Sequence, residues 1–276
     1  MIFEQRHFVA RDGSHPIEAV RLSNVTRGND LSNDQPPLEA VWQYGAWSTE
    51  VAAEPFVRNI LHAATKDRRR ATIWLPSESV LKPFTDDDQW ARLGPILSRV
   101  ADKHEAPVYL APHSIAVSRA ASEAVASPLV QGVVALTPSH TPSEESRGVA
   151  RRIASEGLHW RTLGSTVGNL ATTASLFTGF SVRAMTRPAT TLHESHRGLS
   201  VEAIDNLAKV SQEKPTGVLL ALHDKVFAFD SVLKCLEESN FRGIARAIPA
   251  THISAYVNHR NGKHFYKLWA DTAQTC

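Results

Sequence analysis

Short apolar runs alternate with helical patterns along most of the chain. The runs span 38–43, 71–75, 107–111, 130–137, 216–222 and 243–248. Segments with apolar residues at helical spacing lie at 54–65, 87–103, 114–125, 200–212, 230–238 and 254–268. Short apolar runs are typical of buried strands, and strand–helix–strand repeats require right-handed crossovers. The order therefore predicts an α/β fold, with a mostly parallel central sheet flanked by helices on both faces.

Two segments depart from this alternation. Residues 1–37 alternate weakly and end in Pro36 and Pro37, which predicts an antiparallel hairpin followed by a turn. Between Pro138 and Lys214, amphipathic segments separated by glycines replace the strand pattern. We interpret residues 138–199 as a helical lid inserted before the last two strands. Residues 1–137 and 200–276 then form the core domain.

Composition restricts the partners and the compartment. Of 276 residues, 30 are basic and 28 acidic, so no strong field of one sign recruits nucleic acid or an anionic membrane. The basic cluster 66–70 is interpreted as a solvated helix end. No apolar run approaches the roughly 20 residues of a membrane helix, the first residues lack a signal-peptide pattern, and Cys235 and Cys276 cannot form a disulfide framework. We expect a cytoplasmic protein that binds a small molecule; a homo-oligomer stays open.

The first candidate chemical group is Ser114, which follows the run 107–111 and precedes a helical stretch. Ligands of open parallel sheets bind outside the carboxyl ends of the strands. A serine in a tight strand-to-helix turn, with the small Ala116 two positions later, is the layout of a nucleophile elbow. The N–H of Ile115 would then stabilise an oxyanion. The alternative is that Ser114 only caps the helix.

A candidate acid and a candidate base follow later strands. Asp224 comes after the run 216–222 and His252 after the run 243–248. A histidine there can take the serine proton while the carboxylate orients its ring. With 13 histidines in the chain, any one of them taken alone is more typical of a surface or capping position, and Asp230 is a second candidate acid. The order serine, acid, histidine at three strand ends favours a triad.

These motifs resemble the α/β-hydrolase fold superfamily. The segment 112–116 is similar to the G-H-S-x-G of its lipases, esterases and peptidases, and 216–227 to its strand with a following aspartate. The resemblance implies a Ser114–His252–Asp224 triad without cofactor or metal. The segment 44–48 resembles the H-G-x-x-x loop, which implies Ala46 as the second oxyanion donor.

The sequence also departs from that family. Pro112 stands where glycine is usual and Tyr44 where histidine is usual, and 75–79 lacks the glycines of the family's D-x-P-G-x-G-x-S turn. The predicted substrate pocket consists of Tyr44, Gly45, Trp47, His113, Trp160 and Phe177. The apolar lid residues can equally form the lid's own core. His193, Glu194 and His196 lack a third ligand of suitable context, so we predict a polar lid loop there and no metal.

The sequence therefore predicts a serine hydrolase that forms an acyl-enzyme on Ser114. A carboxylic ester, thioester or lactone fits best, and amide or carbon–carbon bond cleavage stays open. Two alternatives remain. One is a ligand-binding protein that kept the fold with weak or no catalysis, which Pro112 and Tyr44 favour. The other is an acyltransferase, which uses the same triad in a dry, closed site.

Overall fold

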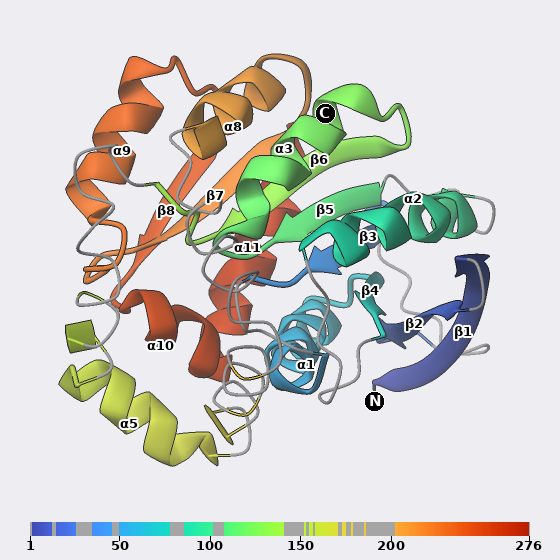
Figure 1. Ribbon diagram of the computed structural model, residues 1–276, viewed down its shortest axis with the longest axis horizontal. Coiled ribbons are helices and arrows are strands. Elements are labelled where there is room, and N and C mark those ends of the chain that lie inside the picture. Colours follow the sequence, from blue (N-terminus) through green and yellow to red (C-terminus); the bar gives the residue numbers. More distant parts are fainter. Residues whose placement is uncertain are drawn as a thin grey trace.

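The computed structural model describes residues 2–12, 15–25, 35–45, 50–77, 86–101, 108–140, 152, 155–156, 158–170, 173–174, 178, 185 and 202–275. At its centre lies an eight-stranded sheet with the order β1-β2-β4-β3-β5-β6-β7-β8 (Figure 1). The strands are β1 (Phe3–Asp12), β2 (His15–Ser23), β3 (Leu38–Gln43), β4 (Ala71–Pro76), β5 (Val108–Pro112), β6 (Val130–Leu136), β7 (Thr216–Ala221) and β8 (Ile244–Ile248). Strands β1 and β2 form the predicted antiparallel hairpin, β2 pairs antiparallel with β4, and all later pairings are parallel. The predicted fold class is confirmed.

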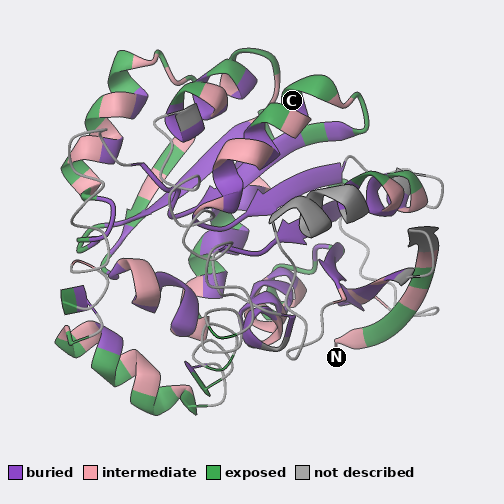
Figure 2. Ribbon diagram, viewed as in Figure 1, coloured by how far each residue is buried: buried purple, intermediate pink, exposed green. Residues whose placement is uncertain are grey.

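Helices cover both faces of this sheet. The helices on the sheet are α1 (Glu50–Lys66), α2 (Asp86–Ala101), α3 (Ala116–Ala126), α8 (Glu202–Glu213), α9 (Phe229–Glu238), α10 (His252–Val257) and α11 (Gly262–Thr272), and α5 (Trp160–Gly168) packs against α10. One apolar core lies between the sheet and α1, α10 and α11, and a second between the sheet and α2, α3, α8 and α9. In β5, Tyr109 and Ala111 enter the first core while Val108 and Leu110 enter the second. Because successive side chains point to opposite faces, a strand covered on both sides is apolar at nearly every position. Figure 2 shows the central strands buried along their length.

The helix predicted over 254–268 is two helices. Asn258 leaves the helical conformation, with φ −77° and ψ 93°, and its side chain accepts the N–H of Arg260. The Asn261 amide donates to the carbonyls of Ser254 and Ala255 at the end of α10. A Cβ at Gly262 would lie 2.9 Å from the Phe56 carbonyl oxygen, so α11 begins where the chain meets α1 closely. These contacts turn the chain between the two helices.

The basic cluster after α1 is not uniformly solvated. Lys66, Arg68 and Arg70 are exposed, but Arg69 is buried and its Nε donates to the Pro36 carbonyl. The expectation of a solvated helix end is therefore wrong for Arg69. Its guanidinium instead joins the end of α1 to the chain that enters β3. Among the described helices, none is long and apolar enough to cross a membrane.

Candidate active site

The turn after β5 holds Ser114 in a strained conformation. Its φ is 54°, in the left-handed region that non-glycine residues rarely adopt, at a cost of about 1 kcal/mol or more. The His113 N–H donates to the Gln43 carbonyl at 3.1 Å, and the Ser114 N–H donates to the Leu136 carbonyl at 3.0 Å. Since these bonds run to β3 and β6 respectively, both neighbouring strands hold the turn although Pro112 supplies no donor.

Three predicted residues meet above this turn. Ser114 Oγ lies 3.0 Å from His252 Nε2, and His252 Nδ1 lies 2.8 Å from Asp224 Oδ2. The other carboxylate oxygen of Asp224 accepts the Phe227 N–H at 2.8 Å, and the Phe227 ring stands edge-on to the imidazole, 5.0 Å between centroids. The geometry is that of a nucleophile, a base and an orienting acid connected by hydrogen bonds.

The loops after β7 and β8 are hydrogen-bonded to each other. The His223 N–H donates to the Ala250 carbonyl and the Leu222 N–H to the Ile248 carbonyl, each at 2.9 Å. Thr251 caps α10 in a capping box with Ser254. His252 is therefore the first residue of a capped helix. This arrangement brings Asp224 and His252 together although 28 residues separate them.

The environment makes His252 a stronger base. Burial lowers its pKa, but the charge and hydrogen bond of Asp224 and the charge of Glu156 more than offset this, so the pKa lies above its ordinary value. The His252 side chain is 12% exposed and that of Asp224 5%. In such a shielded site, fixed charges act more strongly than in water.

Solved structures share this architecture. A serine hydrolase involved in carbazole degradation aligns over 100% of both chains, with a TM-score of 0.59 and 14% identity. A bromoperoxidase from Bacillus anthracis aligns over 98% of this chain and 100% of its own, with a TM-score of 0.62 and 13% identity. Carboxyl esterase 2 from Tuber melanosporum aligns over 99% of this chain and 86% of its own, with a TM-score of 0.62 and 11% identity. The chain has the α/β-hydrolase fold. No protein-family model and no curated protein matches the sequence.

In this α/β-hydrolase fold, His113 is buried next to the triad. Its ring is buried and stacks on Tyr256, 4.6 Å between centroids and 14° between planes. It also lies 6.0 Å from the His252 ring. Burial and the charge of His252 hold the pKa of His113 well below its ordinary value. The neutral ring therefore serves as packing under the base.

Two other predicted pocket residues also occupy different surroundings. Tyr44 lies in the core, where its hydroxyl donates to the Pro76 carbonyl at 2.7 Å. Trp160 is 67% exposed on α5, with the Arg161 guanidinium 4.3 Å from its ring centroid. Tyr44 is thus enclosed in the core, whereas Trp160 meets solvent. Trp47 and Phe177 lie outside the described residues.

The predicted oxyanion donors are described only in part. Ile115 follows the nucleophile in helical conformation, and among the described residues no backbone hydrogen bond uses its N–H. Gly45 lies against the elbow, since a Cβ there would be 3.0 Å from Ser114 Cβ. Ala46 lies outside the described residues. Gly45, just after the end of β3, thus lies beside Ser114, the predicted nucleophile, where the prediction requires a second donor.

The sequence reasoning missed Glu156. This residue is fully buried, and its carboxylate accepts the backbone N–H of His252. No spacing or motif marks it, because it belongs to the region predicted as a lid and meets His252 only in the folded chain. Among the described residues no cluster of three or more His, Cys, Asp or Glu side chains suits a metal, and His193, Glu194 and His196 lie outside them.

Proposed function

We propose that the protein is a serine hydrolase that cleaves a carboxylic ester, thioester or lactone through an acyl-enzyme on Ser114. The observation that carries this proposal is the hydrogen-bonded series from Ser114 Oγ through His252 to Asp224. With Asp224 accepting the Nδ1–H, Nε2 of the neutral ring is left as the acceptor for the serine proton.

Each residue of the triad has a role in the proposed reaction. Ser114 Oγ attacks the substrate carbonyl carbon and passes its proton to His252 Nε2. The attack converts the carbonyl group into a tetrahedral oxyanion. The oxyanion collapses, the bond to the leaving oxygen or sulfur breaks, and His252 gives that atom the proton. Water then attacks the acyl-serine ester, its proton passes through His252 to Ser114, and the acid is released. The Ile115 and Ala46 N–H groups are the proposed oxyanion donors.

The comparisons support the fold of this proposal, and the triad supports its chemistry. Relatives named as a serine hydrolase and a carboxyl esterase share 14% and 11% identity with the chain. A thioesterase domain from the curacin biosynthetic pathway has a TM-score of 0.55 and 10% identity. The bromoperoxidase has the same fold, so fold alone does not select the reaction.

The region 138–199 is proposed as the lid of this site. Its described helix α5 packs against α10, whose first residue is His252. The Thr162 and Thr251 hydroxyls lie 2.8 Å apart, and the Arg161 guanidinium donates to the Pro249 carbonyl at 3.1 Å. This segment therefore borders the base, which is where a lid would select substrates.

A fluorophosphonate probe tests the hydrolase, because it reacts with an activated serine whatever the substrate is. We expect stoichiometric labelling of the wild type, none of Ser114→Ala, and labelling slowed about 10³-fold in His252→Ala. Ser122→Ala, on the exposed side of α3, is the matched control and should label like the wild type. Circular dichroism checks that each variant is folded.

The result also separates the alternatives. Folded wild-type protein that does not label would refute the hydrolase and favour a ligand-binding protein. A labelled enzyme that turns over an acyl donor only with a second acceptor would be an acyltransferase. Matched p-nitrophenyl ester, thioester and lactone substrates then rank the leaving groups by kcat/KM.

A further inference from the structure

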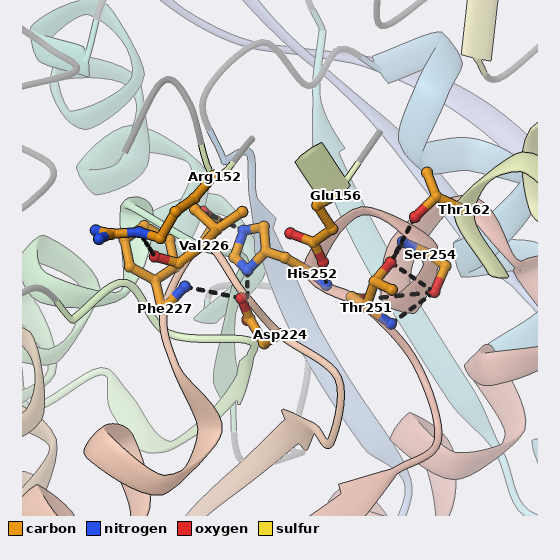
Figure 3. Close-up of polar contacts among 10 residues, drawn as sticks. Arg152, Glu156, Thr162, Asp224, Val226, Phe227, Thr251, His252 and Ser254 are labelled. Atoms are coloured by element: carbon orange, nitrogen blue, oxygen red, sulfur yellow. Dashed lines mark hydrogen bonds and ion pairs between the residues drawn. The ribbon is translucent and has the colours of Figure 1, made fainter. Parts of the chain in front are cut away.

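Side chains from residues 152–162 contact both loops that carry the proposed acid and base, Asp224 and His252. Arg152 Nε donates to the Val226 carbonyl at 3.2 Å, next to the Asp224 loop. Glu156 accepts the N–H of His252, and Thr162 meets Thr251. Figure 3 shows these contacts on either side of the His252 ring. The segment therefore reaches both partners of Ser114.

Glu156 is the unusual member of this group. It is 0% exposed, and among the described residues its Oε2 has no hydrogen-bond partner. Burial raises its pKa to about 7, although the positive charge of His252 and hydrogen bonds from the His252 backbone and Thr251 act in the opposite direction. An enclosed carboxyl is costly unless a nearby charge stabilises its ionised form.

The ionisable groups around Glu156 supply such a charge only when the base is protonated. Among the described residues, those that act on it are His252 and Asp224. Asp224 binds the ring, whereas Glu156 binds the backbone of the same histidine from another side (Figure 3). With a neutral ring, the two carboxylates repel each other. With an imidazolium between them, both are stabilised.

We propose that Glu156 is a positioning residue for His252: its carboxylate fixes the backbone of the base, and its charge stabilises the imidazolium that forms as Ser114 gives up its proton. This inference rests on the proposed hydrolase function. It adds a second carboxylate to the site, delivered by the segment that precedes α5. The ring is then held by Asp224 and its main chain by Glu156.

Glu156→Gln is the direct test, because glutamine keeps the acceptor for the His252 N–H and removes the charge. Glu237→Gln, on the exposed surface of α9, is the matched control. The pKa of His252 is measured by NMR titration of its ring, identified by the signal lost in His252→Ala. The rate of fluorophosphonate labelling is measured over the same pH range.

We expect the His252 pKa to fall by about one unit in Glu156→Gln and to stay unchanged in Glu237→Gln. The acid limb of the labelling rate should move to lower pH by the same amount. The rate on the alkaline plateau should fall several-fold, since a weaker base accepts the serine proton less readily. A purely structural role would lower the plateau without moving the limb.

The outcomes separate this inference from the proposed function. A folded Glu156→Gln protein with an unchanged His252 pKa overturns the role of Glu156, even if the wild type labels well. If the wild type does not label but the His252 pKa is lowered in the variant, the proposed hydrolase function is refuted and the positioning role of Glu156 is supported. If Glu156→Gln does not fold, Glu156→Asp replaces it. Its shorter side chain draws the charge away, so a His252 pKa equal to that of the wild type overturns the proposal.

Discussion

Gly45 lies so close to Ser114, the proposed nucleophile, that a single added methyl group should displace Ser114. A Cβ there would be 2.7 Å from His113 Nδ1 and 3.0 Å from both the His113 carbonyl oxygen and Ser114 Cβ. Ordinary contacts begin near 3.4 Å, so the loop and the elbow must separate by several tenths of an ångström. His113 cannot yield easily, because Tyr256 stacks against its ring at 4.6 Å. The strain therefore reaches Ser114.

We expect Gly45→Ala to reduce kcat/KM about 10- to 100-fold, or ~1.4–2.7 kcal/mol, since a misplacement of 1 Å costs about 100-fold and the shift here is several tenths of an ångström. Overpacking should lower the free energy of unfolding by about 1–3 kcal/mol. The assays are p-nitrophenyl acetate hydrolysis and urea unfolding. Gly164→Ala is the control, because no atom lies within 4 Å of its added Cβ and helical alanine gains about 0.5–1 kcal/mol over glycine. Activity of Gly45→Ala within threefold of the wild type would refute the reasoning.

Three further predictions concern charge and backbone conformation. Asp224→Asn should reduce kcat about 10³–10⁴-fold with little loss of stability, because an amide N–H facing His252 favours the wrong ring tautomer; a tenfold effect would contradict this. Ser114→Gly should resist urea better than Ser114→Ala by about 1 kcal/mol, since both lose the hydroxyl and only glycine adopts a φ of 54° without strain; equal midpoints would contradict it. Glu39 is buried, which raises its pKa from 4.5 to about 7, so the wild type should lose stability relative to Glu39→Gln as pH rises through that range. Urea unfolding at pH 4 and pH 8 should show a relative change of about 3 kcal/mol, with the Trp74 hydrogen bond kept by glutamine; a gap independent of pH would contradict it.

The sheet was predictable because burial on both faces favours apolar residues along each short strand, and this pattern is visible within a few neighbouring residues. Strands such as β5 and β7 are buried at every position, and their nearly continuous apolar runs record this directly. The elbow could be located for the same reason: Ser114 stands where an apolar run ends and a helical pattern begins. Strand order along the chain then placed Asp224 and His252 after later strands.

The break between α10 and α11 was missed at the level of the sequence. The predicted helix 254–268 ran across 258–264, a stretch without apolar side chains that includes Asn258 and Gly262. What ends α10 is the capping by Asn258 and Asn261 and the close approach of Gly262 to α1. The caps are local, but the Gly262 contact joins α11 to Phe56 of α1, about 200 residues earlier in the sequence, which a local pattern does not record.

By itself, the sequence determined the parallel sheet, the N-terminal hairpin and the positions of Ser114, Asp224 and His252 at strand ends. Each depends on hydrophobic pattern or on chain order. Only the tertiary structure decided that Tyr44 is enclosed in the core, that His113 lies under the base, and that Glu156 reaches His252. Which side chains and charges are buried depends on which distant segments come into contact. The energies of those contacts are set by the surroundings in the folded protein rather than by neighbours in the chain.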